Sequence, residues 1–241
     1  MDKLSEQLFD EILQARQRVY AVGEPTPLQQ VKLPGVDAVV FAKREDLGPI
    51  KAYKWRGAYN CMSKLTPEQR AGGVVAASAG NHGQGVALAA SRLGCKAHIF
   101  MPRSTPTVKQ DAVRMHGGEH VEIVLSGDSY DAASAAAHEF AEKNNLTFVH
   151  PYDDLATMGG QGTLADEVVM SGKGPFDRVY LQIGGGGLAS GCACWFKRFW
   201  PGVKCIGVEG VNQASMKLAV EQGERKALPY VDVFCDGTAV R

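Results

Sequence analysis

The chain has 241 residues, of which 45% are hydrophobic and 22% are charged, and its 26 basic residues balance its 26 acidic ones. This is the composition of a globular protein with enough material for a sizeable core. The zero net charge argues against nucleic acid or an anionic membrane as a partner, and no apolar run reaches membrane-spanning length. The acidic N-terminal stretch is unlike a signal peptide, and the six cysteines lack disulfide or zinc spacing, so we predict a cytoplasmic protein.

Strands and helices are predicted to alternate along the chain. The first helix is expected over residues 3–20, where Leu4, Leu8 and Ile12 recur at helical spacing. Further helices are predicted over 54–65, 82–94, 107–117, 128–144, 160–172, 187–199 and 212–222. Strands are predicted over 37–46, 73–78, 96–101, 120–125, 147–151, 177–183 and 203–210. Apolar strands that alternate with amphipathic helices indicate an α/β fold with parallel sheets covered on both faces.

Four consecutive glycines separate the strand at 177–183 from the helix at 187–199. They are Gly184, Gly185, Gly186 and Gly187. The free N–H groups and the dipole of a helix N-terminus bind anions, most often phosphate. Because an ordinary strand-to-helix turn needs only one or two glycines, we predict a phosphate site here. A P-loop is excluded, since Cys192 stands where that motif needs lysine.

A dinucleotide site is one interpretation of the same glycines. Gly184, Gly186 and Ala189 satisfy the G-x-G-x-x-A pattern, and Glu209 stands at the end of the next strand, where an acid that binds ribose is expected. An NAD-dependent oxidoreductase is therefore an open alternative. It leaves two other unusual stretches unexplained.

The first of these is "SAGNHGQG" at 78–85, another predicted strand-to-helix turn. Its residues Ser78, Gly80, Asn81 and His82 offer hydrogen bonds at a helix N-terminus, which suits a carboxylate. The alternative is a plain capped turn with Ser78 or Asn81 as the N-cap.

The second is "KAYKWRGAYN" at 51–60, in which Lys54 is predicted to open a helix. A lone lysine is usually a solvated surface charge. At a helix N-terminus, however, the dipole repels a cation and lowers the pKa of the amine, which can then act as a nucleophile. Pyridoxal 5′-phosphate, acting on an amino acid, meets all three requirements: an aldehyde for Lys54, a phosphate for the glycines and a substrate carboxylate for the 78–82 turn.

The sequence resembles the serine/threonine dehydratases, or threonine deaminases, which are fold type II pyridoxal-phosphate enzymes. The resemblance covers nearly the whole chain and rests on "AYKWRGA", "SAGNHGQG", "GQGTLADEV", "GGGGLASG", "EPTPLQQ", "MPRSTPTVKQDAVRMHGGE" and "GTAVR". It implies a tryptophan synthase β-like fold of two open-sheet α/β domains. The large domain would comprise residues 1–51 and 148–241, and the small domain residues 52–147, with the site in the cleft between them.

The resemblance also implies roles for particular residues. Lys54 would bind the cofactor aldehyde covalently and then act as the base on the substrate α-carbon, Tyr53 would pack beside the ring, and Asn81 would contact the ring 3′-oxygen. The phosphate would be held by Gly184, Gly185, Gly186, Gly187 and the Leu188 N–H. The substrate carboxylate would be bound by Ser78, Gly80, Asn81 and His82.

The implied reaction is the β-elimination of L-threonine to 2-oxobutyrate and ammonia, with L-serine to pyruvate as a second reaction. The enzyme would be a threonine ammonia-lyase of isoleucine biosynthesis and a homo-oligomer. Lys54 is followed by Trp55-Arg56-Gly57, which favours a dehydratase over the cysteine synthases of the same fold.

Serine racemases and other lyases of this fold are alternatives. Racemases use a divalent cation between two acidic residues six positions apart, and Glu209 fits the first position but Ser215 occupies the second, so no metal site is predicted. The chain stops sooner than the catalytic domains of the family. We therefore expect an incomplete large domain with a site open beside the pyridine nitrogen, and an inactive cofactor-binding fragment is a further alternative.

Overall fold

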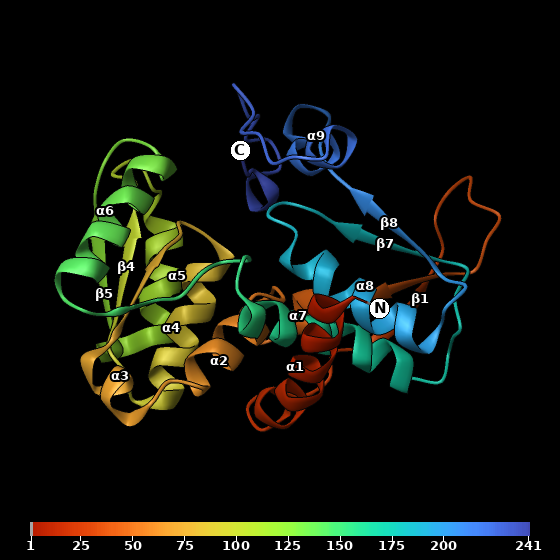
Figure 1. Cartoon of the computed structure of the whole chain (residues 1–241), viewed down its shortest axis with the longest axis horizontal. Coiled ribbons are helices and arrows are strands. Elements are labelled where there is room, and N and C mark those ends of the chain that lie inside the picture. Colours follow the sequence, from red (N-terminus) through yellow and green to blue (C-terminus); the bar gives the residue numbers. More distant parts are fainter. Residues whose placement is uncertain (1) are drawn as a thin grey trace.

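In the computed structural model, which describes residues 2–241, a four-stranded parallel sheet forms the centre of one lobe (Figure 1). The strand order is β5–β4–β3–β6, and the strands are β3 (Val74–Ala77), β4 (Ala97–Met101), β5 (Val121–Leu125) and β6 (Thr147–Phe148). Val74 lies opposite both Ala97 and Thr147 in the register of the central strand. The predicted α/β fold with a parallel sheet is confirmed.

Helices cover both faces of this sheet because its strands are apolar on both sides. Val74 and Ala76 face a core shared with α2 (Trp55–Ser63), α4 (Asn81–Leu93) and α5 (Thr107–Gly117). Val75 and Ala77 face the opposite way, against α6 (Tyr130–Lys143). The short helix α3 (Pro67–Gly72) precedes β3 and is closed at its start by a capping box on Thr66.

The second lobe is built from three packed helices and a smaller sheet (Figure 1). The helices are α1 (Lys3–Tyr20), α7 (Leu155–Met170) and α8 (Gly187–Phe199), and the two parallel strands are β7 (Arg178–Gln182) and β8 (Lys204–Val208). Ile12, Leu164 and Trp195 belong to their common core. Helix α2 packs against both α4 and α7 and so joins the two lobes.

Several elements differ from the sequence-based expectation. The strand predicted over 37–46 is the shorter β2 (Val40–Lys43). It pairs antiparallel with β1 (Leu28–Val31). Neither β1 nor α3 was predicted from the sequence. Helix α7 begins at Leu155 rather than at 160, because the Asp154 side chain accepts a hydrogen bond of 2.7 Å from the Thr157 N–H. The domain boundaries at 52 and 147 stay predictions.

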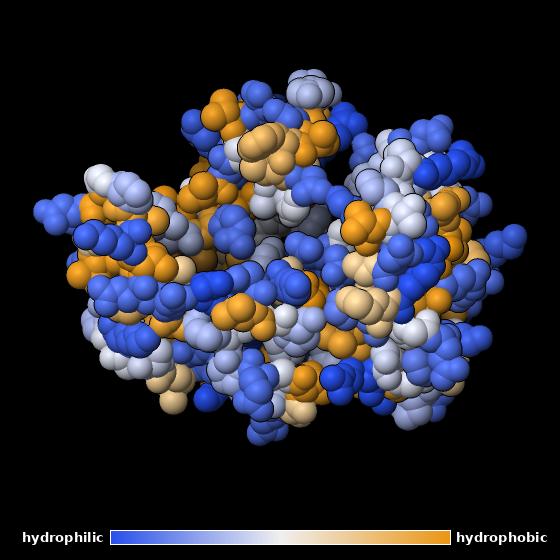
Figure 2. Space-filling model, turned by 180° about the vertical axis from the view of Figure 1, so that it is seen from behind, coloured by the Kyte–Doolittle hydropathy of each residue, from blue (hydrophilic) through white to orange (hydrophobic). Residues whose placement is uncertain are grey.

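The C-terminal part of the chain lies over the space between the lobes. It contains α9 (Ser215–Gln222) and continues to Arg241. Figure 2 shows this part standing above the body of the molecule, with the surface hollowed beneath it. Among residues 2–241, no helix is both long and apolar enough to cross a membrane.

Candidate active site

Lys54 occupies the N-cap position of α2 and is held from two sides. Its Nζ donates a hydrogen bond of 2.8 Å to the carbonyl oxygen of Pro151. Helix α4 packs directly on its backbone, since a Cβ atom at Gly85 would lie 3.1 Å from the Lys54 carbonyl. The amine is therefore fixed by the loop before α7 and by the helix behind it.

The surroundings of Lys54 favour its neutral form. Burial lowers the pKa of Lys54 from 10.5 to about 8. The rings of Tyr53 and Tyr152 have their centroids 5.8 Å and 5.9 Å from Nζ. Burial is thus a cause of the lowered Lys54 pKa in addition to the helix dipole.

The four consecutive glycines are closely surrounded by other parts of the chain. Gly186 has a φ of +86°, in the left-handed region that favours glycine, and it caps α8. A Cβ atom at Gly185 would lie 2.2 Å from Cγ of Tyr152, and one at Gly187 would lie 2.8 Å from the carbonyl oxygen of Tyr152. At Gly184 it would lie 3.1 Å from the carbonyl oxygen of Thr238. The chain around Tyr152 and the C-terminal segment leave little room for side chains here.

Lys54 and the four glycines line the same pocket. Its walls are formed by Tyr53, Lys54, Tyr152, Gln182, Gly184, Gly185, Gly186, Gly187, Leu188, Gly237 and Val240. The first hydrogen bond that closes α8 runs from the Ser190 N–H to the Gly186 oxygen at 2.9 Å, so the N–H groups before it have no partner within the helix. The pocket therefore combines an amine, aromatic rings and an anion-binding helix N-terminus, and these residues fit pyridoxal phosphate.

The predicted carboxylate turn at 78–82 lies outside this pocket, as judged over residues 2–241. Ser78 Oγ accepts a hydrogen bond of 3.2 Å from the Gly80 N–H, Gly80 caps α4, and Asn81 is exposed as its first residue. Whether Ser78, Gly80, Asn81 and His82 bind a substrate carboxylate stays a prediction. The contact of Asn81 with the cofactor ring likewise stays a prediction.

His82 is turned inward and is connected to the same loop as Lys54. Its Nε2 lies 2.9 Å from the Val149 oxygen, and because that oxygen only accepts, Nε2 carries the proton. Its buried Nδ1 has no hydrogen-bond partner among residues 2–241. Burial, reinforced by the charge of Lys54, lowers the pKa of His82 to about 3. Neutral His82 thus donates to the Val149 carbonyl and Lys54 to the Pro151 carbonyl of the same loop.

Sequence reasoning missed four residues of the pocket, namely Tyr152, Gln182, Gly237 and Val240. Tyr152 follows the strand predicted over 147–151, and ligands of open parallel sheets collect beyond the carboxyl ends of strands. The position of Tyr152 could therefore have been inferred. Gly237 and Val240 belong to the "GTAVR" motif, but no local pattern in the sequence places that motif at this pocket.

Glu209, which the dinucleotide interpretation requires, has another role in the structure. Its carboxylate accepts hydrogen bonds of 2.9 Å and 2.8 Å from the N–H groups of Met216 and Lys217. The acid therefore caps the N-terminus of α9 rather than standing free to bind a ribose.

Comparisons with known proteins show the family to which the chain belongs. The family model described as pyridoxal-phosphate dependent enzyme matches residues 19–241. The biosynthetic L-threonine dehydratase IlvA of Haemophilus influenzae is 46% identical over 232 residues, which are 95% of this chain and 44% of that protein. The chloroplastic biosynthetic threonine dehydratase of Arabidopsis thaliana is 46% identical over 226 residues, 93% of this chain and 38% of that protein. The chain belongs to the family of pyridoxal-phosphate dependent enzymes.

Solved structures extend the match to the fold. The processed threonine deaminase isoform 2 of Solanum lycopersicum superposes with a TM-score of 0.92 at 42% identity, covering 100% of this chain and 69% of that one. Maize serine racemase superposes with a TM-score of 0.88 at 31% identity, covering 96% and 70%. The predicted fold type II architecture is thereby confirmed. The chain spans less than half the length of the two dehydratases named above.

Proposed function

We propose that this chain binds pyridoxal 5′-phosphate through Lys54 and catalyses the dehydration and deamination of L-threonine to 2-oxobutyrate and ammonia. One observation carries the proposal: the Lys54 amine and the N-terminus of α8 line one pocket. The names of the relatives in Haemophilus influenzae and Arabidopsis thaliana support threonine as the substrate and isoleucine biosynthesis as the context. L-serine, with pyruvate as the product, is the second substrate that we propose.

The residues of the pocket have distinct tasks in this proposal. Bound pyridoxal phosphate withdraws electrons from the substrate α-carbon and so makes its proton acidic. The N–H groups at the start of α8 hold the phosphate, and the rings of Tyr53 and Tyr152 flank Lys54. Lys54 Nζ binds the cofactor and then accepts the α-proton at close range. Its pKa of about 8 suits a base that works near neutral pH.

The substrate carboxylate is assigned to the N-terminus of α4. Ser78 and Gly80 shape this turn, and the helix that begins at Asn81 packs on Lys54 through Gly85. Since the free N–H groups at a helix N-terminus attract carboxylates, the amino-acid substrate would lie between the N-terminus of α4 and the Lys54 amine.

Turnover of L-threonine tests this function. The purified chain is supplied with pyridoxal phosphate, and 2-oxobutyrate is measured with L-threonine and pyruvate with L-serine. Product formation that is lost in Lys54→Ala and kept in Lys143→Ala, an exposed lysine on α6, is the expected result. A Lys54→Ala variant as active as the original chain would contradict the proposal.

Serine racemization is a second candidate, because maize serine racemase is 31% identical and shares the fold. Formation of D-serine from L-serine, measured beside pyruvate in the same reaction, separates the two activities. An NAD-dependent oxidoreductase is disfavoured, because Glu209 caps α9 and Lys54 faces the glycines. A chain that binds pyridoxal phosphate but converts neither amino acid would be the inactive fragment.

We further propose a cytoplasmic homo-oligomer. All six cysteines, which lie within the described residues, are free thiols, as is usual in a reducing compartment. Exposed apolar side chains such as Val211 and Phe234, at 94% and 91% exposure, are compatible with a contact between subunits. Light scattering of the purified protein would give the number of subunits, and a monomer at all concentrations would contradict this part.

A further inference from the structure

Four charged side chains are buried away from the pocket, where α2 and α7 meet the segment that contains β1 and β2. The side chain of Arg56 is fully buried, and those of Glu167, Lys43 and Glu45 are 4%, 10% and 11% exposed. We call these four residues the anchor cluster. Two positive and two negative charges make the cluster neutral.

Arg56 is the centre of the anchor cluster. Its Nε and Nη2 donate to the two carboxylate oxygens of Glu45 at 2.9 Å and 3.0 Å. Its Nη1 and Nη2 donate to the two oxygens of Glu167, the latter at 3.1 Å. Lys43 Nζ completes the ring by donating to Glu167 at 2.6 Å and to Glu45 at 3.1 Å. Two carboxylates thus accept hydrogen bonds from all three guanidinium nitrogens, a geometry that lysine cannot reproduce.

Three of the sequence motifs each contribute a residue to the hydrogen bonds of this cluster. Thr26, from "EPTPLQQ", donates its N–H to Glu167 at 3.1 Å and its hydroxyl to Glu45 at 2.5 Å. Arg56 belongs to "AYKWRGA", and Thr163, from "GQGTLADEV", accepts a hydrogen bond of 3.2 Å from Arg56. Thr26, Arg56 and Thr163 are therefore explained by one buried network rather than by contact with a ligand.

The anchor cluster fixes the helix that presents Lys54. Arg56 lies two residues after Lys54 in the first turn of α2. Behind it α2 and α7 touch through glycines, since a Cβ atom at Gly160 would lie 2.5 Å from the Arg56 oxygen. Helix α7 in turn begins just after Pro151, whose oxygen holds Lys54 Nζ. A rotation of α2 on α7 would therefore move Nζ away from Pro151 and from the glycines.

Stability alone does not account for such a cluster. Taking charges out of water costs free energy that their mutual attraction offsets only with near-ideal geometry, and apolar replacements are often no less stable. Burial would raise the pKa of Glu45, but the charge and hydrogen bonds of Arg56, with the charge of Lys43, lower it below its ordinary value. Glu45 therefore stays ionised at neutral pH and keeps Arg56 in place.

We propose that Arg56, held by Glu45 and Glu167, is a positioning residue that sets the place of the Lys54 amine at Pro151 and the glycines. This inference rests on the role of Lys54 under the proposed function. In this role the anchor cluster holds the Lys54 amine in place before any cofactor or substrate is bound.

The pH dependence of Lys54 labelling tests this role without using activity. The cofactor-free chain is acetylated with trace acetic anhydride between pH 6 and pH 11, and the Lys54 peptide is quantified by mass spectrometry. In the original chain the midpoint is expected near pH 8. Arg56→Lys keeps the charge but loses the fork, so Nζ leaves its buried position and the midpoint rises by about one pH unit or more. The affinity for added pyridoxal phosphate is expected to fall at least about tenfold.

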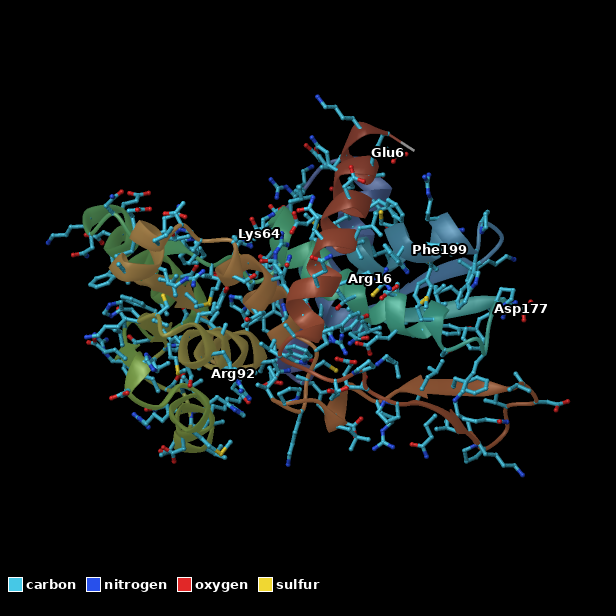
Figure 3. The ribbon with its side chains drawn as sticks, turned by 90° about the horizontal axis from the view of Figure 1, so that it is seen from below. Glu6, Arg16, Lys64, Arg92, Asp177 and Phe199 are labelled. Atoms are coloured by element: carbon cyan, nitrogen blue, oxygen red, sulfur yellow. The ribbon has the colours of Figure 1, made fainter. Side chains whose placement is uncertain are left out.

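Arg16→Met is the matched control. Arg16 lies on α1 (Figure 3), and its 38%-exposed side chain donates to Asp166 at 2.9 Å, so this variant also removes an ion pair to α7 but leaves the cluster intact. Its Lys54 midpoint is expected to match that of the original chain. If circular dichroism shows that Arg56→Lys does not fold, Glu45→Gln, at the edge of the cluster, is used instead. Its Lys54 midpoint is expected to rise by a smaller amount.

A folded Arg56→Lys or Glu45→Gln variant with an unchanged Lys54 midpoint and unchanged affinity for pyridoxal phosphate would overturn the positioning role. An original chain that captures no pyridoxal phosphate would count against the proposed function alone. The labelling comparison is separate, because it is made without cofactor.

Discussion

At the scale of single residues, Lys54 is held in a place that disfavours its charge. Its burial lowers its pKa from 10.5 to about 8, so the folded chain binds fewer protons than the unfolded chain between these values. The free energy of unfolding contributed by this residue therefore rises with pH across that window. Below pH 8 the buried charge costs up to about 3 kcal/mol.

Replacing this lysine is thus expected to stabilise the cofactor-free protein. Lys54→Met should raise the free energy of unfolding at pH 7 by about 1–3 kcal/mol, and the gain should shrink towards pH 10.5 as the amine loses its proton. Urea unfolding at pH 7 and pH 10 measures both values, with the exposed Lys143→Met as the control. A loss of stability at pH 7 would show that the Lys54 hydrogen bond to Pro151 outweighs the cost of burial.

The pocket glycines allow a second prediction at this scale. In Gly185→Ala the new methyl group would lie 2.2 Å from the Tyr152 ring, so the ring or the loop must shift. We expect a loss of about 1–3 kcal/mol in stability and weaker binding of pyridoxal phosphate. Gly202→Ala, where a Cβ atom meets open space, is the control. Equal cofactor affinity in the two variants would contradict the tight contact.

Some site residues could be predicted from the sequence because their chemistry is unusual for their position. A lysine at a helix N-terminus and four glycines in a row both conflict with local preferences, and each conflict indicated a ligand. Tyr152 carries no such conflict, and its approach to Gly185 depends on how the loop folds back. The anchor cluster was missed because arginine and glutamate, read singly, are typical of a solvated surface.

At the scale of elements, the helices with regular apolar spacing could be predicted and the irregular ones could not. Helix α1 over Lys3–Tyr20 and α8 over Gly187–Phe199 match their predicted ranges. Helix α7 contains Gly159 and Gly160, which lower helix propensity, and these glycines obscured its first turn. Packing explains them, since a Cβ atom at Gly159 would lie 2.5 Å from the Glu11 side chain of α1.

The crossing of α7 and α8 is expected to be intolerant of added volume. A Cβ atom at Gly191 would lie 2.4 Å from the Met158 oxygen and 2.9 Å from the Gly162 nitrogen, both backbone atoms of α7. Gly191→Ala should therefore separate the helices, lower the melting temperature and cost about 1–3 kcal/mol, as overpacking does. Thermal unfolding measures the effect against Gly202→Ala. A melting temperature equal to that of the control would show that the crossing relaxes freely.

At the scale of the whole molecule, the C-terminal segment connects to the lobe of the four-stranded sheet through ion pairs. Arg241 contacts Asp131 of α6 at 3.0 Å, and Asp236 contacts Lys109 of α5. These side chains are exposed, so each pair contributes about 1 kcal/mol or less and is screened by salt. The segment also lines the pocket through Gly237 and Val240. Its attachment therefore affects access to the site.

This attachment is expected to loosen with ionic strength. Hydrogen exchange of residues 225–241 should be faster at about 1 M salt than at low salt, while the exchange of β4 stays slow. At low salt Asp131→Asn should reproduce part of the effect. Asp128→Asn, whose carboxylate pairs with Arg103 within the same lobe, should not. Exchange that is independent of both salt and Asp131 would show that apolar contacts hold the segment.

The lysine that captures the cofactor can be identified directly. The chain is mixed with pyridoxal phosphate, reduced with borohydride and digested, and the modified peptide is located by mass spectrometry. A single modified residue, Lys54, is expected, together with no visible absorption band in Lys54→Ala. Modification of another lysine, or none at all in a folded chain, would show that Lys54 does not hold the cofactor.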